Sequence, residues 1–310
     1  MRKTALPVLI MIIITCVVLL PLNVHAAQLV DPNQKGSLEL DYSSNGHGFS
    51  GLEIEIYRVA EINPNGTYRL IDPFDGFPVK IQRITSQKEW RDAANTLAAY
   101  ITADRISPTA KKQTDNSGKV KFTDLATGIY LVMGVTAETE DKIYRFENFC
   151  VFLPRPQPDG TQNYHLQAKP KSSVIPKPEE PEDVKYQVVK LWKDAGSRNQ
   201  RPVRISVEIL KNGILQDTVI LNSENNWTHI WYAPEGEDVW TVVEKDVPDA
   251  YTVVITENDN VFTITNTRPA PPGLPPKTGD TFPLRSWLAV MSLSGILLMI
   301  CGILQKRKRR

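Results

Sequence analysis

Three polar side chains fall where the sequence pattern places the inside of a β-sheet. In YQVVKLWKD, residues 186–194, Lys190 shares a face with alternating apolar residues. Glu244 does the same in VWTVVEKD, and Asn266 in VFTITNT. Alternate side chains of a strand point to the same face of a sheet. Because burial of an unpartnered lysine or carboxylate is costly, we expect Lys190, Glu244 and Asn266 to meet in one core.

These residues belong to a segment, residues 184–268, that alternates in this way along most of its length and predicts a β-sandwich. The preceding stretch SSVIPKPEEPED, residues 172–183, is rich in proline and glutamate. It has little to bury, which predicts a stiff extended linker. The sequence therefore divides residues 27–268 into two modules, at residues 27–171 and 184–268.

Five pieces of the second module follow in order the pattern of the B-type repeat of collagen-adhesin proteins. They are VVKLWKD, RPVRISVEILKNG, NNWTHIWYAP, VVEKDVPDAY and FTITNT. The module resembles this family, in which a lysine of the first strand and an asparagine of the last form an intramolecular isopeptide bond assisted by an acid. The resemblance implies Lys190 as nucleophile, Asn266 as acceptor and Glu244 as the acid.

Burial suits that chemistry because desolvation lowers the pKa of a lysine and raises that of a glutamate. A neutral amine and a protonated acid then become accessible together, and the acid can polarise the Asn266 carbonyl. The alternative is a structural cluster, a buried Lys190–Glu244 pair with Asn266 as an ordinary hydrogen-bonding residue.

The first module contains strand-like stretches and one helix. Ser86 and Glu89 form the capping-box pattern, after which apolar residues at helical spacing predict a helix over residues 86–104. That face carries Trp90, Ala94, Leu97 and Ile101. LEIEIYRVAEI, FTDLATGIYLV and DGTQNYHLQAKPK resemble the N-terminal domain of sortase-assembled pilins.

Two departures from the pilin pattern bear on the chemistry of this module. Tyr42 stands where relatives carry the bonding lysine, and Gly134 where they carry a glutamate. We therefore expect the first module to fold without a bond of the usual kind. YHLQAKPK resembles the motif whose lysine joins the next pilin subunit, which makes Lys171 the candidate, or Lys169; the alternative is a solvated charge.

The two ends of the chain predict export and anchoring. Arg2 and Lys3, a long apolar run and VHA at residues 24–26 predict a signal peptide over residues 1–26. The uncharged stretch at residues 287–304 predicts a transmembrane helix over residues 285–304. The basic residues at 305–310 should stay cytoplasmic.

Residues 269–280 contain a short sequence motif before this span. LPPKTGD resembles the cell-wall sorting signal of Gram-positive surface proteins, with Pro275 in place of its leucine. The resemblance implies a motif of Pro275, Pro276, Lys277, Thr278 and Gly279. Sortase would cut between Thr278 and Gly279 and join the threonine to an amine. A simple membrane anchor with a proline-rich stalk is the alternative.

Charge and cysteine content limit the function classes. The whole chain has 36 basic and 35 acidic residues. Residues 27–278 keep 28 basic and 34 acidic, a net charge of −6 that argues against nucleic acid as a partner. Cys16 and Cys301 lie in the predicted terminal segments, so Cys150 remains alone and no intrachain disulfide is expected.

Catalysis on another molecule is not indicated. His47, His165 and His229 are widely separated, without the spacing of metal ligands. Cys150 lies in an apolar strand pattern and is typical of a core residue. We expect neither a cofactor nor enzymatic activity beyond self-made bond formation.

The combined prediction is a mainly β protein with two tandem immunoglobulin-like modules. We expect a wall-anchored, pilin-type structural subunit whose partners are sortase and either peptidoglycan or another pilin subunit. The alternative is a monomeric wall-anchored adhesin that binds a host protein or glycan. The fold alone does not decide between them.

Overall fold

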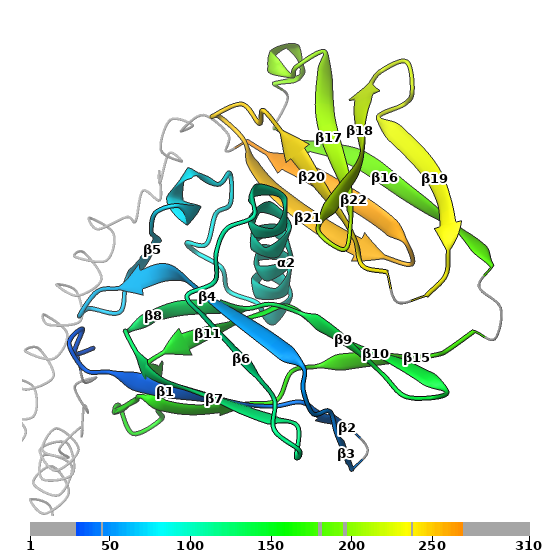
Figure 1. Ribbon diagram of the computed structural model, residues 1–310. Coiled ribbons are helices and arrows are strands. Elements are labelled where there is room, and N and C mark those ends of the chain that lie inside the picture. Colours follow the sequence, from blue (N-terminus) through cyan, green and yellow to red (C-terminus); the bar gives the residue numbers. More distant parts are fainter. Residues whose placement is uncertain (1–28, 45, 179–181, 195–196, 237, 269–310) are drawn as a thin grey trace, which may run out of the picture. The chain divides into compact units, whose positions relative to one another are not determined.

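The computed structural model describes residues 29–44, 46–178, 182–194, 197–236 and 238–268 (Figure 1). The predicted signal peptide, sorting motif, transmembrane helix and basic tail lie outside these residues. Within the described ranges, no helix is both long and apolar enough to cross a membrane. The described residues, which end at Arg268, belong to one compact unit.

The described chain is mainly β. The elements before residue 177 are β1 (Gly36–Asp41), β2 (Ser43–Ser44), β3 (His47–Gly48), β4 (Glu53–Ile62), β5 (Tyr68–Leu70), the 3₁₀ helix η1 (Phe74–Gly76), α2 (Gln87–Asp104), β6 (Ala110–Gln113), β7 (Lys119–Leu125), β8 (Gly128–Val132), β9 (Val135–Glu138), β10 (Lys142–Phe146), β11 (Phe149–Leu153), β12 (Arg155–Pro156), β13 (Gln162–Asn163), β14 (His165–Ala168) and β15 (Ser172–Pro176). The remaining elements are β16 (Asp183–Lys193), the 3₁₀ helix η2 (Arg198–Gln200), β17 (Arg204–Lys211), β18 (Ile214–Asn222), β19 (Thr228–Pro234), β20 (Trp240–Lys245), β21 (Thr252–Asn258) and β22 (Val261–Thr267).

Three main sheets form the first part of the chain. Their strand orders are β14-β1-β7, β15-β10-β9 and β11-β8-β4-β5, with β6 also paired to β4. One apolar cluster fills the space among their inner faces, and its most buried members include Leu38, Leu40, Tyr42 and Phe122. Burial of these large side chains is the main force that holds the sheets together.

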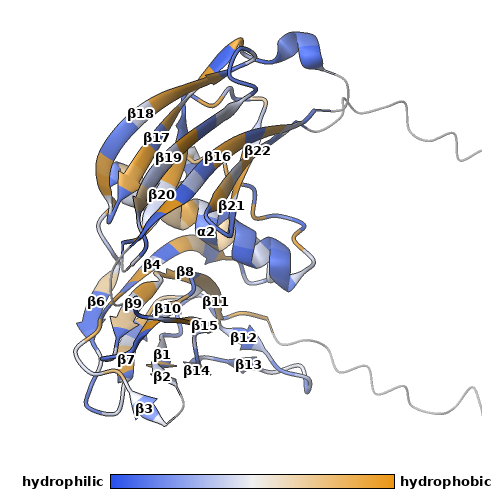
Figure 2. Ribbon diagram, turned by 90° about the vertical axis from the view of Figure 1, so that its right-hand side faces the viewer, coloured by the Kyte–Doolittle hydropathy of each residue, from blue (hydrophilic) through white to orange (hydrophobic). Residues whose placement is uncertain are grey.

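Two sheets form the second part, in the orders β19-β16-β22-β21 and β18-β17-β20. Buried and less buried residues alternate along β16 and β22, as the sequence pattern predicts for strands with one face in a core. The alternating hydropathy of these strands is visible in Figure 2. β16 pairs with β22 in parallel, and the other pairs of this part are antiparallel.

The predicted linker is partly structured. Residues 172–176 form β15, which pairs antiparallel with β10 from Lys142↔Pro176 to Phe146↔Ser172. The serines and prolines of this stretch gave it the composition of a linker, but an edge strand tolerates both because its outer hydrogen-bonding groups need no partner strand. The sheet β15-β10-β9 therefore extends past the expected boundary at residue 171.

Helix α2 begins where the capping box predicts. The Ser86 side chain accepts a hydrogen bond from the Glu89 amide, and the Glu89 carboxylate accepts one from the Ser86 amide. The helix ends at Arg105, whose backbone is left-handed with φ 54°. On its apolar face Ala94, Leu97 and Ile101 are at most 1% exposed, which confirms the helix and its buried face.

Strand pairing and core packing divide the chain differently. Among the described residues, strands before residue 177 pair only with one another, and so do strands after residue 182. A second apolar cluster, however, contains Leu97 and Ile101 of α2 together with Val207 and Val253 of the second part. The sheets separate at the linker, whereas the hydrophobic core continues across it.

Candidate functional site

The three residues singled out by alternation come from both sheets of the second part. Lys190 lies on β16 and Asn266 on β22, within the same sheet. The parallel register pairs Lys190 with Ile264 and Trp192 with Asn266, so Lys190 and Asn266 share a face two positions apart. Glu244 lies on β20 of the other sheet, opposite Val207. The structure thus places Glu244 across the core from the two residues that the proposed bond would join.

Contacts among these residues are short and buried. Lys190 Nζ lies 3.0 Å from Glu244 Oε2, and neither side chain is exposed to solvent. Asn266 Nδ2 donates a hydrogen bond of 2.8 Å to Glu244 Oε1. The carboxyl group therefore bridges the amine and the amide nitrogen. The sequence argument had placed it against the Asn266 carbonyl instead.

Other groups complete the surroundings of the amine. Lys190 Nζ lies 3.5 Å from the Ile264 carbonyl and 4.4 Å from the centre of the Trp192 ring. The sequence analysis did not identify Trp192 as a site residue, although its position two residues after Lys190 places it on the same face of the strand. An aromatic face attracts a cation, so the ring stabilises the charged form of the amine.

A second ion pair lies beside this ring. Arg201 donates from Nε and Nη2 to the two oxygens of Asp194, at 2.5 and 2.9 Å. Its guanidinium lies 5.5 Å from the Trp192 ring centre. This pair was also missed from the sequence, because Asp194 and Arg201 lie between β16 and β17, outside the strands, where no alternating pattern places side chains.

Burial shifts the pKa values of both Lys190 and Glu244. Desolvation lowers the pKa of Lys190 to about 8, although the nearby Glu244 carboxylate opposes this shift. Desolvation also raises the pKa of Glu244, against the opposing effects of Lys190 and Asn266. The shifts favour a neutral amine next to a protonated acid, the pairing that amide exchange needs.

The first part of the chain lacks these ingredients in its described residues. Tyr42 is fully buried and packs its ring edge-on against Phe146, with ring centres 5.0 Å apart. A Cβ at Gly134 would lie 2.6 Å from the Phe146 carbonyl oxygen, so a glutamate does not fit this backbone. Every described lysine before residue 179 is exposed. No lysine there has the desolvated amine that bond formation requires.

The two candidate pilin lysines lie on the surface. Lys171 is exposed directly before β15, and its carbonyl accepts a hydrogen bond of 2.9 Å from the Glu147 amide. Lys169 is exposed after β14, and its Nζ donates to Ser43 Oγ at 2.9 Å. The structure therefore fixes the backbone at Lys171 while its side chain stays accessible. Pro275, Pro276, Lys277, Thr278 and Gly279 lie outside the described residues.

Other residue types offer no second centre of chemistry within the described ranges. No group of three or more histidine, cysteine, aspartate or glutamate residues there is arranged to hold a metal ion. Cys150 of β11 packs against the apolar cluster that contains α2, and burial raises the pKa of its thiol to about 12. A thiol with so high a pKa stays protonated near neutral pH and is a poor nucleophile.

The second part of the chain matches a known protein family. Residues 186–267 match the model of the Cna protein B-type domain. The chain is also 33% identical over 195 residues to the collagen adhesin of Staphylococcus aureus. That match covers 59% of this chain and 15% of the adhesin. The segment with Lys190, Glu244 and Asn266 thus matches the Cna B-type domain, while the chain spans 15% of the adhesin's length.

Solved structures with some similarity include collagen-binding and pilus proteins. A single B repeat unit of the collagen-binding surface protein of S. aureus is 14% identical, with a TM-score of 0.27 and coverage of 76% of this chain and 99% of that one. The T6 backbone pilin of Streptococcus pyogenes is 13% identical, with a TM-score of 0.31 and coverage of 59% and 40%. The major pilin SpaD of Corynebacterium diphtheriae is 17% identical, with a TM-score of 0.25 and coverage of 77% and 65%. Scores this low carry no argument about function.

Proposed function

We propose that this chain is a structural subunit of pilin type, anchored to the wall of a Gram-positive cell and internally cross-linked between Lys190 and Asn266. One observation carries the proposal: a buried lysine and a buried asparagine meet at a single carboxyl group inside a Cna B-type domain. An ordinary buried ion pair is weak evidence for stability. A covalent bond between β16 and β22 would account for this buried polar cluster.

The proposed reaction exchanges one amide for another. The neutral Lys190 amine attacks Cγ of Asn266, and a new Nζ–Cγ bond forms. The Cγ–Nδ2 bond breaks and the nitrogen leaves as ammonia. Glu244 starts protonated and is in contact with both nitrogens at 3.0 and 2.8 Å; it supplies its proton to the leaving nitrogen and then takes the proton that the amine loses. The carboxyl group ends in its starting state, and no other reactant is needed.

Attachment and assembly would use other residues of the chain. We propose that sortase cleaves between Thr278 and Gly279 and transfers the threonine to peptidoglycan or to a pilin lysine. Lys171 is the preferred pilin lysine, because its side chain is exposed while its backbone is held beside β15. On this proposal the protein is a substrate of sortase, and its only chemistry is self-modification.

A mass measurement tests the internal bond. The exported chain up to Arg268, purified and measured intact, should weigh one ammonia less than its sequence. A peptide map should contain one branched peptide that joins the Lys190 and Asn266 segments. A full sequence mass in a folded protein would reduce the cluster to a buried ion pair.

The similarity to a collagen adhesin supports a second candidate function. The chain could act as a monomeric wall-anchored adhesin that binds a host protein or glycan, with the Cna B-type domain as its stalk. Denaturing electrophoresis of wall extracts separates the two functions. Only covalent polymerisation gives a ladder of high-mass species, whereas a monomeric adhesin gives one wall-linked form.

A further inference from the structure

The two sheets of the Cna B-type domain each end in an edge strand that faces the first part of the chain. β20 is the edge of one sheet and β21 the edge of the other. An edge strand leaves a row of backbone N–H and C=O groups without partners in the sheet, and buried groups of this kind need partners elsewhere. In this chain, residues of the first part supply hydrogen-bond partners to three of these backbone groups.

Helix α2 supplies one partner to each edge. Thr96 Oγ1 accepts a hydrogen bond of 2.9 Å from the Ile255 amide of β21. Tyr100 donates its hydroxyl to the Glu244 carbonyl of β20 at 3.1 Å. Thr96 and Tyr100 are four residues apart, so they lie on one face of the helix. Both side chains are buried, which makes these contacts part of the interior.

The segment before the helix adds a third contact. The Pro78 carbonyl accepts a hydrogen bond of 2.6 Å from the Val253 amide of β21. Val253 is the residue that pairs with Asn266 across β21 and β22. The first part of the chain therefore holds the backbone of the acid itself and of the residue beside the acceptor.

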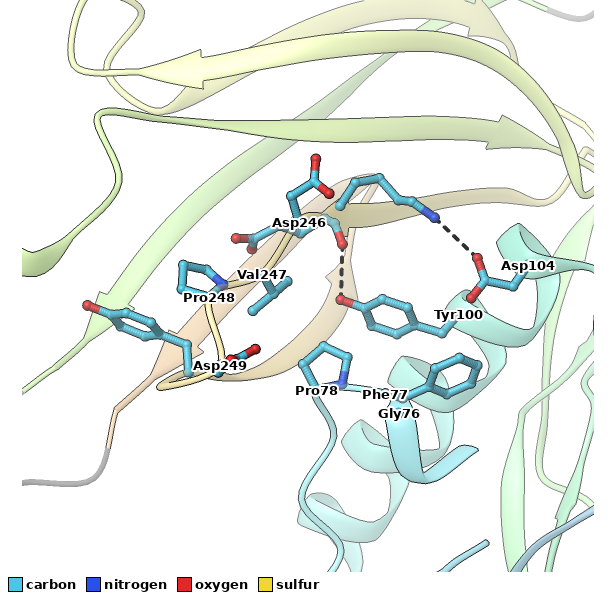
Figure 3. Close-up of a pocket in the computed structure, with 12 residues that line it drawn as sticks. Gly76, Phe77, Pro78, Tyr100, Asp104, Asp246, Val247, Pro248 and Asp249 are labelled. Atoms are coloured by element: carbon cyan, nitrogen blue, oxygen red, sulfur yellow. Dashed lines mark hydrogen bonds and ion pairs between the residues drawn. The ribbon is translucent and has the colours of Figure 1, made fainter. Parts of the chain in front are cut away.

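Figure 3 shows this junction as the wall of a pocket. Tyr100 points from α2 toward the β20 backbone, and Pro78 lies on the same side. Asp104, one turn further along the helix, lies 3.2 Å from the Lys245 ammonium. The ion pair and the Tyr100 hydrogen bond thus hold two consecutive residues of β20.

We propose that Tyr100 is a positioning residue for the Lys190–Asn266 bond, and that α2 must dock on β20 and β21 before the bond forms at its full rate. This inference rests on the proposed function. Glu244 has to lie within hydrogen-bonding distance of two nitrogens at once, and misplacement of a catalytic group by about 1 Å can cost about 100-fold in rate. β20 pairs with a strand on one side only, so the tyrosine hydroxyl fixes its free side.

The test follows bond formation over time in the full chain. Protein made by cell-free translation is sampled at intervals, quenched in denaturant and digested, and the branched peptide is quantified. We expect Tyr100→Phe, which keeps the ring and removes the hydroxyl, to slow bond formation about fivefold, the effect of one lost hydrogen bond. Thr96→Val should also slow it, and Thr96→Ser, which keeps the accepting oxygen, should restore the rate.

Tyr130→Phe is the matched control. Tyr130 is also buried and donates to a backbone carbonyl, that of Ala126 at 2.8 Å, but within the first part of the chain. Both tyrosine variants should lower the melting temperature by similar amounts, and only Tyr100→Phe should slow the bond. Unchanged rates in Tyr100→Phe and Thr96→Val would overturn the positioning role while leaving the bond established. A wild-type chain without the branched peptide would overturn this inference together with the proposed function.

Discussion

Replacement of Glu244 by glutamine separates the proposed acid from the two bonding partners. Glutamine has nearly the same shape and keeps a hydrogen-bonding group next to Asn266, but it cannot pass a proton between the two nitrogens. We expect Glu244→Gln to stay at the full sequence mass, because the amine then has neither a proton acceptor nor an acid for the leaving group.

The structure sets the size of the stability loss. The proposed bond would tie β16 to β22 and close a loop of about 76 residues, from Lys190 to Asn266. In the chain-entropy model used for disulfides, a loop of that length contributes about 4.5 kcal/mol. A unit of about 240 residues loses about 2–4 °C of melting temperature per kcal/mol. We therefore expect Glu244→Gln to melt roughly 9–18 °C below the wild type, and lower still where Lys190 remains charged without its partner.

Intact mass and thermal unfolding, recorded on the same samples, form the assay. Glu208→Gln is the matched control, since Glu208 lies on β17 of the same sheet, is partly exposed and pairs with Lys245 only at 3.9 Å. It should keep the ammonia loss and change stability by less than about 0.5 kcal/mol. Complete ammonia loss in Glu244→Gln would refute the role of the carboxyl group, and an unchanged melting temperature without the bond would refute the stability argument.

Three further predictions concern the pH dependence and the surface attachment. The rate of bond formation should follow a bell-shaped curve in pH. At low pH both groups are protonated, so the amine cannot attack. Above about pH 8, the lowered pKa of Lys190, the Lys190–Glu244 pair has no proton left for the leaving nitrogen. Newly translated chain diluted into a series of buffers gives this profile, and a rate that keeps rising well above pH 8 would contradict it. Thr278→Ala should leave the protein in the membrane fraction, as cell fractionation can show, and equal wall attachment would defeat the sorting proposal. Lys171→Ala should abolish any high-mass ladder in wall extracts while Lys169→Ala keeps it, and the opposite result would move the role to Lys169.

Local patterns were enough to place much of this fold. The two-residue period of β16 and β22 predicted that Lys190 and Asn266 point inward, because the side chains of a strand alternate between its two faces whatever strand it pairs with. The capping box fixed the start of α2, because the Ser86 and Glu89 contacts involve neighbouring residues only. These features depend on short stretches of chain, so sequence reasoning could predict them.

Features that depend on long-range packing could not be predicted in this way. Alternation placed Glu244 on an inner face but could not say that its sheet lies opposite the sheet of Lys190, nor that its carboxyl contacts the Asn266 nitrogen. Composition placed residues 172–176 in a linker, whereas pairing with β10 decides that they form a strand.

Packing between the two parts of the chain is another long-range feature that the sequence could not predict. The apolar face of α2 predicted that the helix is buried, and a helix can bury such a face against any sheet of suitable shape. Only the tertiary structure showed that Thr96 and Tyr100 reach the open edges of β21 and β20. The hydrophobic effect that drives this burial is non-directional, so the choice of partner comes from shape and from the buried backbone groups that must find hydrogen bonds.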